Sequence, residues 1–120
     1  MRGRSVGMLR VAVATVGYEG LRDRVASELA RCPTLTILEI DEEGMSYRLL
    51  EVIENKAAKF SQGAGPIFVY TLAEKGVEVV LGPVAGMGIA DLLAEAKIKF
   101  VKCEPGTRVE DALNSVLRKP

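Results

Sequence analysis

Residues 77–102, VEVVLGPVAGMGIADLLAEAKIKFVK, decide the fold. Val77–Leu81 is a short β-branched run that is typical of a buried strand, and Gly82–Gly88 is a glycine-rich turn. Ile89, Leu92, Leu93 and Ala96 then recur at helical spacing, and Ile98–Lys102 again has the composition of a strand. A strand, a helix and a second strand in this order predict two parallel strands joined by a right-handed crossover.

The same alternation continues on both sides of this unit. Pro66–Lys75 is apolar nearly all round at its start and is followed by Gly76, which predicts a buried helix that ends there. After the turn Glu104–Gly106, a last helix begins near Thr107. The second half therefore predicts a parallel sheet covered by helices.

The first half contains three more strand-like runs, Leu9–Thr15, Thr34–Ile40 and Met45–Ile53. The last two are joined by an acidic turn and predict a hairpin, which adds one antiparallel strand to the sheet. Residues 21–31 fit either a short helix or an exposed loop, and residues 55–65 predict a loop. We expect an α/β fold with helices on both faces of the sheet.

Composition excludes several classes of function. The chain has 120 residues, and we expect one domain over residues 8–120 after a flexible extension over residues 1–7. The 16 basic and 16 acidic residues balance, which argues against a nucleic-acid partner. The sequence has no His, so it contains no His-dependent catalytic set or metal site. It also lacks an apolar run long enough to cross a membrane, and we expect a cytoplasmic protein.

Several segments, taken in order, resemble the dinitrogenase iron–molybdenum cofactor biosynthesis family, a group of small cofactor-binding proteins. They are residues 9–14 (LRVAVA), 52–55 (VIEN), 63–65 (GAG), 73–80 (AEKGVEVV) and 105–113 (PGTRVEDAL). The resemblance implies a three-layer α/β/α domain with a ribonuclease-H-like motif, whose five-stranded mixed sheet has the order 3-2-1-4-5 with strand 2 antiparallel. It does not imply nuclease activity, because Val11–Thr15 has no carboxylate for a metal ion.

The resemblance further implies a non-enzymatic carrier of an iron–molybdenum or iron–sulfur type cluster, with a protein partner in cofactor assembly. Many members carry His-Phe-Gly-Arg before strand 2, whereas this chain has Glu28-Leu29-Ala30-Arg31. Arg31 is thus the matching candidate for cofactor binding. Glu28 is a harder ligand than the histidine it replaces and suits iron–sulfur chemistry poorly.

In this topology the glycine-rich turns and both cysteines lie at one edge of the sheet, where open α/β sheets bind ligands. The turns open helices, whose amino ends attract anions, although such glycines also serve simply to make tight turns. Both cysteines are candidate metal ligands on opposite rims of a pocket or across a dimer, and small buried thiols are the alternative. The candidate residues are Gly63, Gly65, Gly82, Gly86 and Gly88 for the cradle and Cys32 and Cys103 for metal.

Two other functions fit the same sequence. One is a small-anion or nucleotide sensor that uses the same helix amino ends. The other is a protein-interaction module, as a monomer or a weak homodimer. Hydrolysis is disfavoured, because Asp91 and Glu95 share a helix face but have no evident nucleophile as a partner.

Overall fold

The computed structural model describes residues 8–41, 43 and 46–117. Its strands are β1 (Met8–Thr15), β2 (Thr34–Asp41), β3 (Ser46–Glu54), β4 (Val79–Gly82) and β5 (Lys99–Lys102). The helices are α1 (Ala64–Glu74), α2 (Met87–Glu95) and α3 (Val109–Leu117), with short 3-10 helices η1 (Gly20–Arg22) and η2 (Lys56–Lys59). The flexible extension expected over residues 1–7 and most of the β2–β3 turn lie outside the described residues.

The five strands form one sheet in the order β3-β2-β1-β4-β5, which confirms the predicted topology. β2 pairs antiparallel with both β1 and β3, whereas β4 pairs parallel with β1 and with β5. The central strand β1 sets the register, since Ala12 lies opposite Ile37 of β2 and Val80 of β4. Helices and strands alternate from α1 onward, and this alternation in the sequence predicts the parallel pairing of β4 and β5.

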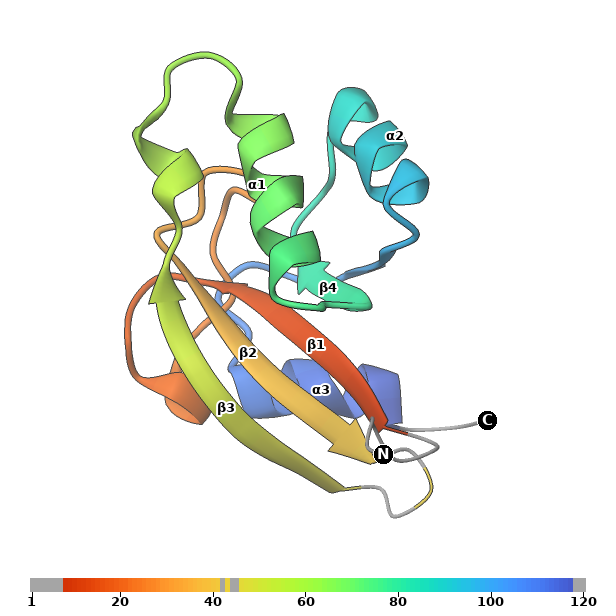
Figure 1. Ribbon diagram of the computed structural model, residues 1–120. Coiled ribbons are helices and arrows are strands. Elements are labelled where there is room, and N and C mark those ends of the chain that lie inside the picture. The colour runs from red at the N-terminus through yellow and green to blue at the C-terminus, as the bar shows by residue number, and fades with distance from the viewer. Residues whose placement is uncertain (1–7, 42, 44–45, 118–120) are drawn as a thin grey trace.

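Helices cover both faces of the sheet, as the three-layer prediction requires, with α1 and α2 on one face and α3 on the other (Figure 1). An apolar core lies on each face between the helices and the sheet. Side chains alternate along β1, so Ala12 and Ala14 face α1 and α2, while Val11 and Val13 face α3. Phe68 of α1 is fully buried in the first core. Within the described residues, no helix combines the length and the apolar character that a membrane crossing needs.

The helix considered for residues 21–31 does not form. Only η1 is helical in this segment, and the residues after it form bridges to β1 and to the segment before α3 instead. The backbone N–H of Ala26 donates to the carbonyl oxygen of Ala14 at 2.8 Å, and that of Val25 donates to Thr107 at 2.8 Å. These tertiary hydrogen bonds use the backbone groups that a local helix would need, so the loop alternative describes the segment better.

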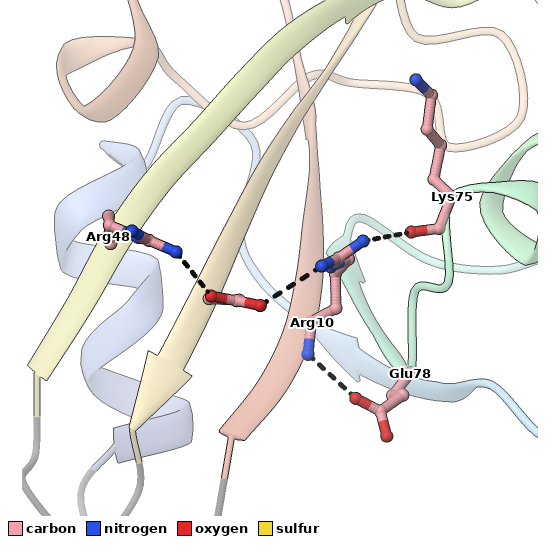
Figure 2. A network of polar contacts seen from close by, with 5 residues as sticks. Arg10, Arg48, Lys75 and Glu78 are labelled. Atoms are coloured by element: carbon pink, nitrogen blue, oxygen red, sulfur yellow. Dashed lines mark hydrogen bonds and ion pairs between the residues drawn. The ribbon is translucent and has the colours of Figure 1, made fainter. Parts of the chain in front are cut away.

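A polar network holds the carboxyl end of α1 on the sheet (Figure 2). The Arg10 guanidinium donates to the carbonyl oxygen of Lys75 at 3.1 Å and to the carboxylate of Glu39 at 3.2 Å. Arg48 donates to the other Glu39 oxygen at 3.0 Å, and the backbone N–H of Arg10 donates to Glu78 at 2.9 Å. This end of α1 is therefore fixed opposite the edge that carries the glycine-rich turns.

Candidate functional site

The expected edge of the sheet is assembled by short hydrogen bonds between segments that are far apart in the sequence. The backbone N–H of Cys103, after β5, donates to the carbonyl oxygen of Gly82 at 2.7 Å. The hydroxyl of Thr34, at the start of β2, donates to the carbonyl oxygen of Gly17 at 2.6 Å. The backbone N–H of Asn55, after β3, donates to Pro33 at 3.0 Å. The ends of all five strands thus meet where the topology places them.

The main feature of this edge is a pair of helix amino ends. Helices α1 and α2 both begin at this end of the sheet and run side by side (Figure 1). A Cβ atom added to Gly65 in the first turn of α1 would lie 2.6 Å from Cδ1 of Ile89 in the first turn of α2, so the two turns are in contact. The partial positive charges of the two helix dipoles therefore lie next to each other.

Neither helix has a side chain at its N-cap, because the N-cap residues are Gly63 and Gly86. Serine, threonine, asparagine or aspartate at this position would accept hydrogen bonds from the first-turn N–H groups. Here the N–H groups of Gly65 and Gly88 have no side-chain cap, and Pro66, the third residue of α1, has no N–H group. Two adjacent helices of this kind offer several donors to one anion.

The five predicted glycines do not have the same role. A Cβ atom on Gly86 or Gly88 would meet nothing within 4 Å, so the backbone is open there. Gly63 has a φ of +77°, which glycine adopts without strain. Gly82 is buried, and its Cβ atom would lie 2.6 Å from Cδ1 of Leu29. Gly82 and Gly65 thus lie against side chains. Gly63, Gly86 and Gly88, in contrast, have open space at the Cβ position.

Arg31 lies beside the segment that leads into α1, and part of its guanidinium is engaged there. Its Nε donates to the carbonyl oxygen of Phe60 at 3.1 Å, and its Nη2 donates to the carbonyl oxygen of Ser61 at 2.8 Å. Both carbonyls belong to the segment that leads from η2 into α1. Arg31 therefore fixes the approach to the amino end of α1.

The two cysteines are not brought together. Cys32 is fully buried in the core beneath α1, whereas Cys103 lies in the core that faces α3. Burial raises the pKa of Cys32 to about 12, although a hydrogen bond from Asn55 opposes the shift. Burial also raises the pKa of Cys103, against a hydrogen bond with Ser115. Both thiols are therefore protonated at neutral pH and do not form one ligand set.

Acidic and thiol side chains also do not gather elsewhere. In the part of the chain that the structure describes, no group of three or more Cys, Asp or Glu side chains is placed to hold a metal ion.

Sequence reasoning missed two features of the edge. Exposed apolar side chains surround the helix ends: Phe60 is 46% exposed, Val84 66% and Met87 84%. For Phe60 and Val84 the signal was their position in polar or glycine-rich loops, since apolar residues there have no core to join. Asn55 was also missed, and its fully buried amide holds the segment before β2 by donating to Ala30 and Cys32 at 2.9 and 2.8 Å.

Solved structures share this architecture. The chain is similar to the apo form of the orange protein from Desulfovibrio gigas, with 27% identity and a TM-score of 0.76, over 92% of this chain and 88% of that one. It is similar to a NifB-like protein from Thermotoga, TM1290, of the DUF35 family, with 31% identity and a TM-score of 0.68, over 90% and 86%. Protein PH0822 shares the fold, with 20% identity and a TM-score of 0.73, over 91% and 90%.

A search of the curated proteins gives no significant match. The family model described as dinitrogenase iron-molybdenum cofactor, however, matches residues 8–119, a range that includes every residue that the structure describes. The resemblance seen in the sequence is thereby confirmed, and the chain belongs to the dinitrogenase iron-molybdenum cofactor family.

Proposed function

We propose that this protein is a non-catalytic carrier that holds an anionic metal–sulfur cluster, of the iron–molybdenum or iron–sulfur type, at the paired amino ends of α1 and α2. The observation that carries the proposal is the contact between two helix starts whose N-caps are glycines. Membership of the family supports a metal cluster as the cargo. In this proposal the carrier acts in the cytoplasm and passes its cargo to a protein partner.

The cargo would be held chiefly by backbone N–H groups. Charge-assisted hydrogen bonds from Gly65, Met87 and Gly88 suit the sulfide surface of an anionic cluster, and the helix dipoles add to the attraction. Phe60, Val84 and Met87 present apolar surface beside these donors, which fits weakly hydrated sulfides better than strongly hydrated oxygens. Since Cys32 and Cys103 are buried and protonated, this mode of binding does not depend on either thiol.

The experiment compares two tetrahedral dianions, tetrathiomolybdate and molybdate, by anaerobic equilibrium dialysis with molybdenum analysis. We expect the wild-type protein to retain tetrathiomolybdate. The Cys103→Ser variant should retain the same amount. Met87→Pro removes one donor at the first position of α2, where proline is well tolerated, and Gly86 before it is already extended with ψ of 164°. Loss of one charge-assisted bond should weaken binding by about tenfold or more.

Met87→Ala is the matched control, because it removes the same exposed side chain but keeps the N–H group. Equal binding by Met87→Pro and Met87→Ala would contradict the proposed use of the backbone. Loss of binding in Cys103→Ser alone would instead assign the cargo to the thiol.

The second candidate is a sensor of small oxyanions or nucleotides, because helix amino ends of this kind also suit phosphate. Phosphate and molybdate binding as tight as that of tetrathiomolybdate would favour this sensor. The same dialysis therefore separates the two functions.

A further inference from the structure

A groove of about 350 Å³ lies between α1 and α2 on their exposed side. It is lined by Pro66, Val69, Tyr70 and Ala73 of α1, by Leu92 of α2 and by Ala96, which follows α2. The α1 residues follow the spacing i, i+3, i+4, i+7, so they form one stripe along the helix. Tyr70 is 64% exposed in this stripe, which is more than a core position would allow. The groove thus has the shape and the pattern that a third helix would fill.

The charged residues within α1 and α2 all have one sign, and the nearest lysines, Lys75 and Lys97, follow the carboxyl ends of these helices. The residues of α1 and α2 include Glu74, Asp91 and Glu95 and no Lys or Arg. Glu95 lines the groove, and Asp91 lies one turn before it on the same side of α2. Lys75, which follows α1, is engaged with Glu51 at 3.1 Å on the sheet. A protein of zero net charge therefore presents a local acidic strip along an apolar groove.

We propose that this groove binds an amphipathic helix of a partner protein, with apolar residues facing the groove and Lys or Arg residues meeting Asp91 and Glu95. The eleven residues of α1 span about 16 Å, which matches three turns of such a helix. Apolar anchors at helical spacing provide the affinity, and the opposite charges set the orientation and exclude acidic partners. This site goes beyond the cluster-carrier function, which rests on the amino ends of the same helices.

A second copy of the described chain does not supply this helix. The apolar side of α3 is buried, with Val109 and Leu113 fully inaccessible to solvent. The other two α-helices contain only acidic charges and would repel the groove. Because no helix among the described residues has a free basic amphipathic face, our proposal assigns the groove to a different protein with a basic amphipathic helix.

The test uses two fluorescent peptides of about 14 residues, close to the shortest length that forms a helix in water. Both have leucine at i, i+3, i+4 and i+7, and they differ only in lysine or glutamate elsewhere. In fluorescence anisotropy, we expect the wild-type protein to bind the lysine peptide at least about tenfold more tightly than the glutamate peptide. Asp91→Lys combined with Glu95→Lys should reverse or abolish this preference.

Two further variants separate the groove from general charge attraction. Glu28→Lys with Glu104→Lys makes the same change in net charge at exposed positions away from the groove, and should leave the affinity within about twofold. Ala73→Gln with Ala96→Gln fills the groove without changing charge, and should weaken the lysine peptide by about fivefold or more. Circular dichroism confirms that each variant is folded.

Equal binding of the two peptides, or no binding of either, overturns the proposal. The proposal is also overturned if Glu28→Lys with Glu104→Lys weakens binding of the lysine peptide as much as Asp91→Lys with Glu95→Lys does. An unchanged affinity in Ala73→Gln with Ala96→Gln overturns it as well. Light scattering shows whether the protein is a homodimer. If it is, and if Ala73→Gln with Ala96→Gln abolishes the dimer, the groove is an interface between two copies and the proposal is overturned. Tetrathiomolybdate binding should be unaffected by Ala73→Gln with Ala96→Gln, so failure here and failure of the carrier function are distinguishable.

Discussion

Cys32 and Cys103 lie in separate cores on opposite faces of the same sheet. Burial raises the pKa of Cys32 to about 12, which lowers its thiolate fraction at neutral pH by about a thousandfold relative to an ordinary thiol. We expect Cys32 to react with a disulfide reagent at pH 7.5 only as fast as the protein opens. Time courses in buffer and in denaturant check this, and prompt modification of Cys32 in the folded protein would contradict it.

Replacement of Asn55 by Ala should destabilise the protein and expose Cys32. The Asn55 amide donates to Ala30 and Cys32, and its carbonyl oxygen accepts from the N–H of Ala57 at 3.2 Å. Removal leaves buried carbonyl groups without donors, at a cost of about 1–3 kcal/mol. Urea denaturation and thiol reaction rates measure the two effects. Asn114→Ala, at an exposed position of α3, is the control that should change neither quantity.

Alanine should have different effects at Gly82, which ends β4, and at Gly88, which lies in the first turn of α2. A Cβ atom at Gly82 would lie 2.6 Å from Leu29 and 3.3 Å from Ala14, so Gly82→Ala requires repacking and should cost about 1–3 kcal/mol. At Gly88 the Cβ atom has open space inside a helix, and Gly88→Ala should be neutral or stabilise by up to about 1 kcal/mol. Thermal unfolding of the two variants provides the comparison. Equal destabilisation would mean that the packing around Gly82 is not tight.

Arg31→Gln should loosen the segment before α1 while leaving the rest of the fold intact. The variant loses the two hydrogen bonds to Phe60 and Ser61, so local opening becomes easier. We expect hydrogen exchange in residues 60–65 to accelerate by about tenfold, together with weaker tetrathiomolybdate binding. Arg22→Gln is the matched control, because the exposed Arg22 makes no side-chain hydrogen bond to any described residue. Unchanged exchange in Arg31→Gln would remove Arg31 from its positioning role.

Glu39 should contribute to acid sensitivity. Hydrogen bonds from Arg10, and then from Arg48, hold the pKa of the Glu39 carboxyl below its ordinary value. A lowered pKa in the folded state gives stability that is complete above the pKa of the unfolded chain and is lost as pH falls through the folded pKa. The Tm gap between wild type and Glu39→Gln should therefore be constant near pH 7 and narrow below about pH 4.5. A gap that stays constant down to pH 3 would contradict this assignment.

Local patterns were sufficient for much of the fold. Residues 77–102 predict the β4–α2–β5 unit because apolar residues recur at the spacing of each element, and glycine and proline mark the ends. The exact ends of the elements depend on backbone hydrogen bonds and were predicted less well. The helix predicted to begin at Pro66 begins at Ala64 in the structure. The predicted topology also placed the glycine-rich turns together at one edge of the sheet, because the carboxyl ends of parallel strands share an edge.

The sequence by itself determined the elements, their order and the family, because these depend on periodicity and on motifs in adjacent residues. Only the tertiary structure decided that residues 21–31 are not a helix, that Cys32 and Cys103 occupy different cores, and that Arg31 binds two carbonyl groups. The physical reason is that each of these outcomes depends on hydrogen bonds or burial between residues far apart in the chain. Such contacts have energies comparable to local propensities, and they exist only once the sheet is assembled.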